Sequence, residues 1–439
     1  MSIRNKAHLL FGGTVVTTAL SVTMGIILAR LLGPIGMGRY QMPTSLGMVI
    51  ATFSDFGIGL ATIYFLNVHK VDTEKLVSTA MGCGIVLGVL SGVVTYCLLS
   101  YGGRYAGVLS GGVKIIFSVG VGLITLRYAL CQILMAKMRV VTYALVNVLS
   151  LLSTLLLLSA LVPCHALNVD TALIAASFGQ LTACGMVLFG LRDYISFTCM
   201  PDLGLIWRML QYGLQLYTVN LLLVLDLNIG LLGVGFLMPG QFSEIAFFSR
   251  AVAVCGVMRL IPTSLTTLLY SHWCTVEGEE RLRQVEGAIR INLVIGLALL
   301  VGIVLSGRYF IIILYGKSFL PAVMVLRILA LQQMMWMVSK VFQAFFASTG
   351  KPLLTSINMA IANVVSILCL LFLTPRLGIT GAAIAVTLGQ AVYIVMNFVQ
   401  ARAIGLRISG AVEIRWSDIR YAVRSFSPRR TQLSERKST

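Results

Sequence analysis

The chain has 439 residues, of which 58% are hydrophobic and only 11% are charged. Soluble domains carry about 25% charged residues, so this composition excludes an ordinary water-soluble fold. A mean hydropathy of +0.93 indicates a membrane protein whose helices satisfy their own backbone hydrogen bonds in lipid. The formal net charge of +18 does not indicate a nucleic-acid partner, because the basic residues are spread over short connections and the C-terminal segment.

Apolar segments recur along the whole chain, and each is long enough to cross a hydrocarbon core, which takes about 20 helical residues. The first is too long for a cleaved signal peptide and leads directly into the second. Lys and Arg are more frequent in the connections on the side of the N-terminus, which predicts that both chain ends are cytoplasmic. The twelve predicted spans are residues 10–32, 41–66, 76–100, 113–135, 141–164, 170–191, 211–236, 244–270, 288–307, 321–347, 352–374 and 380–402.

Motifs for enzymatic or metal chemistry are missing from the sequence. It contains no P-loop, HExxH or GxSxG motif, so we expect a protein that is not an enzyme. Its nine cysteines lie mostly within apolar segments, without the Cys or His spacing of a metal site. We interpret them as small buried apolar residues and expect neither a metal nor a cofactor.

Similar residues recur at nearly constant separations, which indicates an internal repeat. Two homologous six-helix halves would enter the bilayer with the same polarity and face a central cavity, as in alternating-access transporters. The predicted lobes are residues 1–200 and 201–402, followed by a tail over 403–439. The repeated residues are Gln132, Ala136 and Asn147 with Gln343, Ala347 and Asn358, then Ala175, Gly179, Gln180 and Arg192 with Ala385, Gly389, Gln390 and Arg402, and Gly25, Pro34, Leu60 and Thr62 with Gly230, Pro239, Leu265 and Thr267.

Several segments resemble one family of bacterial membrane proteins, the polysaccharide-transporter flippases. LARLLGPIGMGRY (28–40) and SDFGIGLA (54–61) are similar to the opening of that family, and residues 224–251 with LIPTSL (260–265) to its seventh and eighth helices. LYGKSFLPAVMVLRILA (314–330), ASTGKPLL (347–354) and TPRLGITGAAIAVTLGQ (374–390) resemble its C-terminal half. The resemblance covers roughly residues 5–405, and it departs at Gln215, where the family often has a proline.

The resemblance implies a function. The family belongs to the multidrug/oligosaccharidyl-lipid/polysaccharide exporter (MOP) superfamily. Its members move polyprenyl-pyrophosphate-linked oligosaccharides from the inner to the outer leaflet of the bacterial cytoplasmic (inner) membrane, for lipopolysaccharide or exopolysaccharide export. It implies as partners the lipid-linked substrate, membrane lipids, a polysaccharide polymerase and glycosyltransferases.

Charged residues inside the predicted spans point independently to an anionic substrate. Such residues are costly in lipid and usually face a cavity or a partner. The basic ones outnumber the acidic ones, Asp55 and Asp226, so a cavity that they line would attract pyrophosphate and repel organic cations. Arginine suits this role because its planar fork binds phosphate oxygens through paired hydrogen bonds. The five candidate substrate-binding residues are Arg127, Arg250, Arg259, Arg327 and Lys340.

Each of these residues also has a structural interpretation. Arg250, Arg327 and Lys340 lie close enough to a membrane surface for their charged ends to reach the interface. Asp55 and Asp226 either form ion pairs with neighbouring arginines or bind a coupling ion. Aromatic residues such as Trp336, Tyr217 and Tyr128 either stack on sugar rings or pack in the core, and the Gly84, Gly88 and Gly92 stripe predicts a helix-packing surface.

The tail after residue 403 has a different pattern. Val412, Trp416, Ile419, Val423 and Phe426 form one apolar stripe, accompanied by several arginines. This pattern predicts a basic amphipathic helix on the anionic cytoplasmic leaflet, and docking onto a partner protein is the alternative.

Two other functions compete with the flippase. A cation-coupled multidrug antiporter of the same superfamily should have an acidic rather than a basic cavity. A membrane O-antigen polymerase or ligase usually has a long outer loop, and no predicted outer connection exceeds about a dozen residues.

Overall fold

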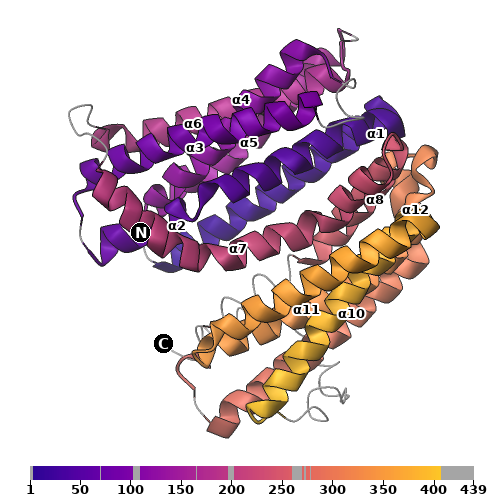
Figure 1. Cartoon of the computed structure of the whole chain (residues 1–439). Helices are drawn as coiled ribbons and strands as arrows, with labels where there is room; N and C mark the ends of the chain where they lie inside the picture. Colours follow the sequence, from indigo (N-terminus) through magenta and orange to yellow (C-terminus); the bar gives the residue numbers. More distant parts are fainter. Residues whose placement is uncertain are drawn as a thin grey trace, which may run out of the picture. The chain divides into compact units, whose positions relative to one another are not determined.

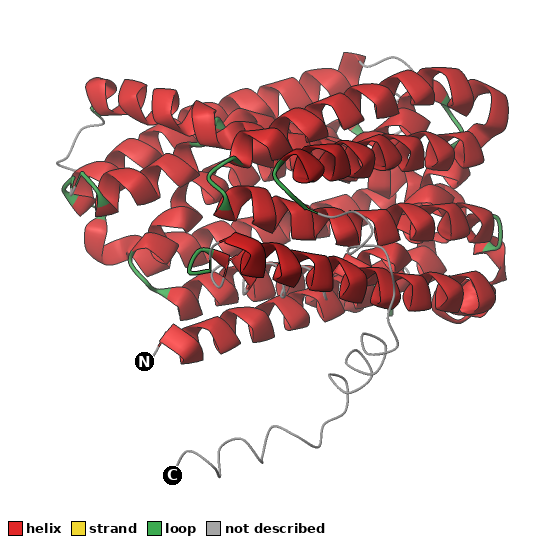
Figure 2. Ribbon diagram, turned by 90° about the horizontal axis from the view of Figure 1, so that it is seen from below, coloured by secondary structure: helices red, strands yellow, loops and turns green. Residues whose placement is uncertain are grey.

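The computed structural model describes residues 3–69, 71–101, 109–164, 166–195, 202–259, 269–270, 273–276 and 278–406, without the side chains of residues 3–8, 10, 11, 215 and 216. Throughout these ranges the regular structure is helical, as Figures 1 and 2 show. This confirms the predicted all-α membrane fold. The predicted amphipathic tail lies outside the described residues, apart from its first few positions.

The helices belong to two compact units. Unit 1 comprises residues 1–250 and 314–319, and unit 2 comprises residues 251–313 and 320–439. The lobe boundary at 200/201 comes from the repeat rather than from compactness, and it remains a prediction.

In chain order the helices are α1 (Ile3–Asp55), α2 (Ile58–Asn67), α3 (Thr73–Tyr101), α4 (Gly111–Ala136), α5 (Val140–Leu161), α6 (Val169–Leu191), η2 (Arg192–Tyr194), α7 (Leu203–Leu237), α8 (Phe242–Gly256), η3 (Val257–Arg259), α10 (Gly278–Tyr315), η4 (Lys317–Phe319), α11 (Ala322–Ser348) and α12 (Pro352–Ala403).

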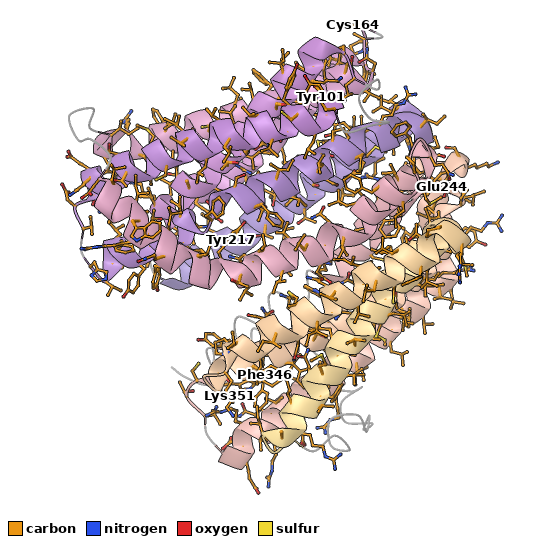
Figure 3. All side chains as sticks on the ribbon, in the orientation of Figure 1. Tyr101, Cys164, Tyr217, Glu244, Phe346 and Lys351 are labelled. Carbon is orange, nitrogen blue, oxygen red and sulfur yellow. The ribbon has the colours of Figure 1, made fainter. Side chains whose placement is uncertain are left out.

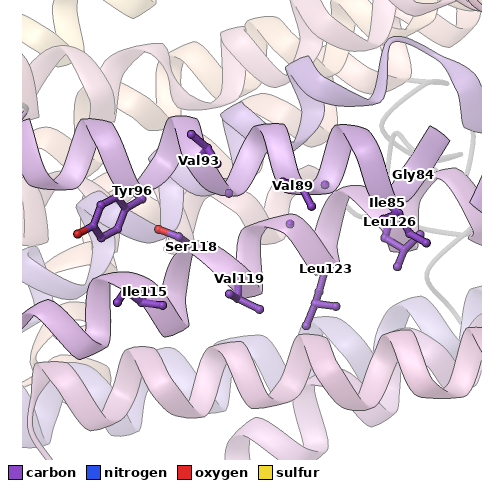
Figure 4. A pocket seen from close by; sticks show the side chains of 13 residues that line it. Gly84, Ile85, Val89, Val93, Tyr96, Ile115, Ser118, Val119, Leu123 and Leu126 are labelled. Carbon is purple, nitrogen blue, oxygen red and sulfur yellow. The ribbon is translucent and has the colours of Figure 1, made fainter. Parts of the chain in front are cut away.

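Glycines bring α3 and α4 of unit 1 into backbone contact. A Cβ atom on Gly88 would lie 2.8 Å from the carbonyl oxygen of Gly122, and one on Gly122 would lie 2.6 Å from that of Gly88. Small residues allow this approach, which supplies the van der Waals packing that joins helices in lipid. The predicted helix-packing role of the glycine stripe in α3 is thereby confirmed (Figure 4).

The core of unit 2 is aromatic. Trp273, Phe342, Phe345 and Phe346 are fully buried and pack with apolar side chains of α10 and of the end of α12. Phe346 is labelled in Figure 3, near the end of α11. This cluster holds α11 in place and so positions the polar residues on the rest of that helix.

Kinks explain how these helices accommodate twelve crossings. Nine described helical segments are long and apolar enough to span a membrane, and two of them, Gly12–Asn67 and Pro352–Ala403, have 56 and 52 residues. Each of these two is interrupted by a glycine with left-handed φ, 66° at Gly33 and 62° at Gly378, and therefore holds two crossings. The predicted eighth span begins as α8 and continues beyond the described residues. Twelve crossings are thus consistent with the structure.

The two halves also make one packing contact in common. In unit 1, a Cβ atom on Gly179 of α6 would overlap the Thr154 side chain of α5. In unit 2, a Cβ atom on the repeated Gly389 would overlap the Ser366 side chain in the first arm of α12. Equivalent glycines at equivalent helix contacts are what an internal repeat requires.

Candidate functional site

A polar face runs along α11 in unit 2. Gln333, Trp336 and Lys340 are spaced by three and four residues, which places them on one side of a helix. Arg259, in the short helix η3 of the same unit, reaches this face: its Nε atom donates a hydrogen bond of 2.9 Å to Oε1 of Gln333. The structure therefore brings together two of the predicted substrate-binding residues.

Arg259 and Lys340 both contact the Trp336 ring. The guanidinium carbon of Arg259 lies 5.3 Å from the ring centre, and Nζ of Lys340 lies 4.8 Å from it. Both distances fall within the range of cation–π attraction. Trp336 is buried, and both cations are half-buried. One indole ring therefore holds two positive charges.

Further hydrogen-bond donors complete this cluster. Nε2 of Gln333 is buried without a hydrogen-bond partner, although Oε1 of the same side chain accepts from Arg259. Lys340 donates to Oε1 of Gln343, one turn along α11, at 2.8 Å. We call Arg259, Gln333, Trp336 and Lys340 the Trp336 cluster. It combines two cations with an amide donor, which together suit a phosphate group.

The third predicted cation, Arg127, lies in unit 1 on α4. Its Nη1 atom donates to Oδ1 of Asn147 at 3.1 Å, its guanidinium carbon lies 5.5 Å from the Tyr128 ring centre, and its Nε atom is buried without a partner. Arg127 lines a cavity of about 250 Å³. The polar residues around this cavity are Tyr40, Thr44, Arg127, Tyr128, Ser150, Thr154, Ser177 and Gln180.

Arg250, on α8 in unit 1, is enclosed by neutral groups. It is 7% exposed, and it donates to the backbone carbonyl of Gly25 at 3.3 Å and to Oε1 of Gln41 at 2.8 Å. Its guanidinium carbon also lies 5.7 Å from the Tyr315 ring centre. Since Gly25 and Gln41 flank the kink at Gly33, Arg250 ties the two arms of α1 together.

Arg327 is placed apart from the other candidates. It is exposed on α11 and shares a helix face with Met324 and Leu331, which are 54% and 41% exposed. An arginine among exposed apolar residues matches the interfacial interpretation, and the structure does not bring Arg327 into the Trp336 cluster.

The two acidic candidates both lie in unit 1. Asp226 is a half-buried residue of α7. Asp55 is the last residue of α1, and its Oδ1 atom is buried without a hydrogen-bond partner. Several ion pairs between side chains occur among the described residues.

Those ion pairs lie at helix ends. Nζ of Lys75 lies 2.7 Å from Oδ2 of Asp202, the residue that caps α7, and the hydrogen bond from Lys75 holds the pKa of Asp202 below its usual range. A hydrogen bond of 2.8 Å from Arg139 likewise lowers the pKa of Asp193. Both pairs fall between predicted spans, where connections meet water.

An apolar groove lies along the outer face of the α3–α4 pair. It measures about 450 Å³ and is lined by exposed valines and isoleucines above the glycine contact, as Figure 4 shows. Ser118 and Tyr96 supply its few polar atoms. A surface of this kind faces lipid chains, so we assign it no role in binding a charged head group.

Some of these candidate residues could be predicted from the sequence and others could not. Lys340 was predicted because it is a charge inside a span, and its helical spacing from Gln333 and Trp336 is a signal that could have indicated Gln333. Gln41 and Tyr315 lie far from Arg250 in the sequence, and no local pattern indicates that they contact it.

Comparisons with known proteins agree with this architecture. The family model of the lipid II flippase MurJ matches residues 274–434, less than half of the chain. Among curated proteins, none matches the sequence significantly. Of the solved structures, the lipid II flippase MurJ in an inward closed conformation aligns with a TM-score of 0.75 at 12% identity, covering 94% of this chain and 91% of that one.

Two further structures have the same fold. An inward-facing multidrug-resistance MATE transporter of the MOP superfamily aligns with a TM-score of 0.71 at 18% identity, covering 88% of this chain and 94% of that one. A MOP-superfamily transporter from Pyrococcus furiosus, described by a reversed polarity of its binding pocket that suggests a different function, aligns with a TM-score of 0.64 at 18% identity and coverages of 92% and 94%. The chain is therefore a multi-pass membrane protein with the fold of MOP-superfamily transporters.

Proposed function

We propose that this chain is a flippase that moves a polyprenyl-pyrophosphate-linked oligosaccharide from the inner to the outer leaflet of a bacterial cytoplasmic membrane. The Trp336 cluster is the observation that carries the proposal. Arg259 and Lys340 supply positive charge for pyrophosphate, the Gln333 amide supplies a donor, and the buried Trp336 ring holds both cations in place. Arg127, with a buried Nε and a polar cavity beside it, contributes a second cationic position in unit 1.

The comparisons support this proposal. The match to the lipid II flippase family model, residues 274–434, includes the α11 face that carries Trp336 and Lys340. Lipid II flippases and MATE proteins are transporters, so we further propose that this chain acts by alternating access and is not an enzyme. Export of a surface polysaccharide, cooperation with a polymerase and glycosyltransferases, and cytoplasmic chain ends are parts of the same proposal.

The multidrug antiporter remains the alternative, and the charges of the candidate site distinguish the two. An organic cation requires acidic or purely aromatic groups, whereas the Trp336 cluster presents two cations. The enzyme alternative, an O-antigen polymerase or ligase, has no observation in its favour in the described part of the chain.

A reconstituted translocation assay tests the proposal. The full chain is placed in proteoliposomes with a fluorescent polyprenyl-pyrophosphate-linked glycan in one leaflet, and its appearance in the other leaflet is measured. We expect Arg259→Ala to reduce the rate at least tenfold, since charge-assisted hydrogen bonds to the phosphate contribute about 1.5–3 kcal/mol. Arg259→Lys should recover part of the rate, because the charge remains but the paired geometry is lost.

Arg283→Ala is the matched control. Arg283 is an arginine of unit 2 on α10 with an 80% exposed side chain, and its loss should leave the rate unchanged. Efflux of cationic dyes without glycan movement would replace this proposal with the antiporter, and formation of longer glycans would indicate a polymerase.

A further inference from the structure

A pocket of about 490 Å³ lies in unit 1, where the end of α2 meets the start of α7. These two helices pack against each other, as Figure 1 shows. Its residues straddle the end of the predicted span 41–66 and the start of the predicted span 211–236, so the pocket lies where the helices leave the lipid. The lining residues are Tyr64, Phe65, His69, Val71, Leu205, Arg208, Gln211 and Tyr212.

Aromatic rings form one wall of this pocket. Tyr64 of α2 stacks on Tyr212 of α7, with ring centres 4.0 Å apart and an angle of 17° between the planes. His69 stacks on Phe65, with ring centres 5.2 Å apart and an angle of 25°. Phe65 is 6% exposed and belongs, with Leu205, to the hydrophobic core that α2, α3, α4 and α7 share. Because this core fixes the wall, the pocket is formed before a ligand binds.

Three side chains around the pocket carry hydrogen-bond donors. Arg208 and Gln211 are exposed and lie three residues apart on one face of α7. Within the described part of the chain, the side chains of these two residues and of His69 form no hydrogen bond or ion pair. A guanidinium with neutral donors beside it suits a phosphate group, whose oxygens accept several charge-assisted hydrogen bonds.

Arg208 is the one permanent charge among the described residues that line the pocket. The carboxylates closest to it in the structure's helix order do not neutralise it: Asp202 is paired with Lys75 at 2.7 Å, and Asp72 and Glu74, at the start of α3, are not lining residues. The pocket is therefore positively charged at the edge of the membrane.

Exposed apolar side chains border the pocket on both helices. Val68, next to His69, is 61% exposed, and Trp207, next to Arg208, is 64% exposed. A polar pocket with an apolar border at the end of a span suits a molecule that has a charged head and hydrocarbon chains. Basic pockets between membrane helices bind lipid head groups in this way. A soluble phosphate compound would make no use of the apolar border.

We propose that this pocket, which we call the Arg208 pocket, binds the phosphate group of an anionic phospholipid. The Arg208 guanidinium donates to the phosphate oxygens, the Gln211 amide adds a neutral donor, and the acyl chains extend past Val68 and Trp207 into the membrane. The lipid comes from the leaflet on the side of the α2–α3 connection, which is cytoplasmic in the predicted topology. The site lies in unit 1, apart from the Trp336 cluster in the sequence, and it does not depend on the proposed function.

Native mass spectrometry of the full chain in detergent tests the pocket without any glycan. Retention of phosphatidylglycerol is compared with that of the zwitterionic phosphatidylcholine, and the difference between wild type and Arg208→Gln isolates this site from lipid bound elsewhere. We expect Arg208→Gln to weaken the tightest phosphatidylglycerol binding about tenfold. Arg208→Lys should keep part of it, because the charge remains. Arg208 is exposed, so both variants should fold. Equal retention by wild type and Arg208→Gln would overturn the proposal.

Arg192→Gln provides the matched control. Arg192 of η2 is also an arginine of unit 1, its side chain is 65% exposed, and it does not line the pocket. Its connection is predicted to lie on the same side of the membrane, so the substitution removes one positive charge there without touching the site. Retention of phosphatidylglycerol should stay at the wild-type level. An equal loss in both variants would show that overall charge attracts the lipid, and the pocket would then have no specific role.

Two further probes separate the phospholipid from other sources of phosphate. Inorganic phosphate should not displace phosphatidylglycerol from wild type, because it has no chains to pack on the apolar border, and displacement would overturn the lipid assignment. Polyprenyl pyrophosphate that displaces the Arg208-dependent phosphatidylglycerol would instead make the transport substrate the occupant of the pocket. If wild type retains phosphatidylglycerol through Arg208 but moves no glycan in the translocation assay, the proposed function fails and the Arg208 pocket stands.

Discussion

Units 1 and 2 hold arginines of the predicted spans in contrasting ways. Arg250 of unit 1 is 7% exposed, donates hydrogen bonds to the Gly25 carbonyl and the Gln41 amide oxygen, and lies over the Tyr315 ring. Arg259 of unit 2 is half-buried, with one hydrogen bond to Gln333 and a ring contact to Trp336 among its interactions. Burial with many structural partners indicates a residue that holds the fold, whereas partial exposure on an aromatic ring indicates one that can meet a ligand.

Removal of Arg250 provides the strongest test of this contrast. Arg250→Met would leave Oε1 of Gln41 without its donor and would remove the second hydrogen bond to the Gly25 carbonyl, which should destabilise the protein by about 3 kcal/mol. We expect a lower amount of folded protein by fluorescence-detected size-exclusion chromatography and a lower melting temperature. Arg250→Lys should be nearly as harmful, because a single ammonium group does not reproduce the geometry of the guanidinium.

The contrary result would be equally informative. Normally folded Arg250→Met that moves no glycan would assign Arg250 to substrate binding, as the sequence allowed. Arg250 and Arg259 would then differ in burial but would both bind substrate.

Trp336→Leu tests the proposed ligand-binding role of Arg259 in unit 2. The substitution keeps an apolar side chain but removes the ring that holds Arg259 and Lys340. Since each cation–π contact contributes about 0.5–2 kcal/mol, we expect translocation to fall about tenfold in the reconstituted assay. Trp207→Leu is the control, because Trp207 of α7 is 64% exposed and should affect the rate little. An equal loss in both variants would mean that tryptophan substitutions impair the protein in general.

Much of the fold followed from hydrophobicity, whereas the site did so only in part. Apolar segments of about 20 residues predict crossings because lipid leaves no other arrangement for the backbone. Arg259 and Lys340 were both predicted as cations inside spans, and Trp336 was predicted either to stack on a sugar or to pack in the core. That all three meet, and that Gln333 joins them, depends on packing between η3 and α11, which no local pattern encodes.

Asp55 illustrates the same limit. An aspartate inside an apolar span indicates an ion pair or a functional group, and the sequence left both interpretations open. Its surroundings depend on the left-handed backbone at Phe56, where φ is 46°, and on the close approach of α7 to Gly57 at Tyr217, which is distant in the sequence. Contacts of this range are set by tertiary structure.

The smallest expected effect concerns the exposed ion pair at the start of α7. Lys75 holds the pKa of Asp202 below its usual range, so the pair stabilises the fold above the unfolded aspartate pKa of about 3.9 and loses this contribution as the pH falls through the folded value. Lys75→Met should lower the melting temperature slightly at neutral pH, and the difference from wild type should disappear in strong acid. High salt should reduce it as well, because the pair is exposed to solvent.

The contact between Gly88 and Gly122 has a mechanical consequence. Where two backbones touch without intervening side chains, no rotamer change can absorb a displacement, so α3 and α4 should travel as one rigid body during a transport cycle. Bending is then left to positions where the chain already departs from helical geometry, the glycines at 33 and 378. We therefore expect glycine to act both as a rigid helix contact and as a point of bending, according to whether a neighbouring backbone lies against it.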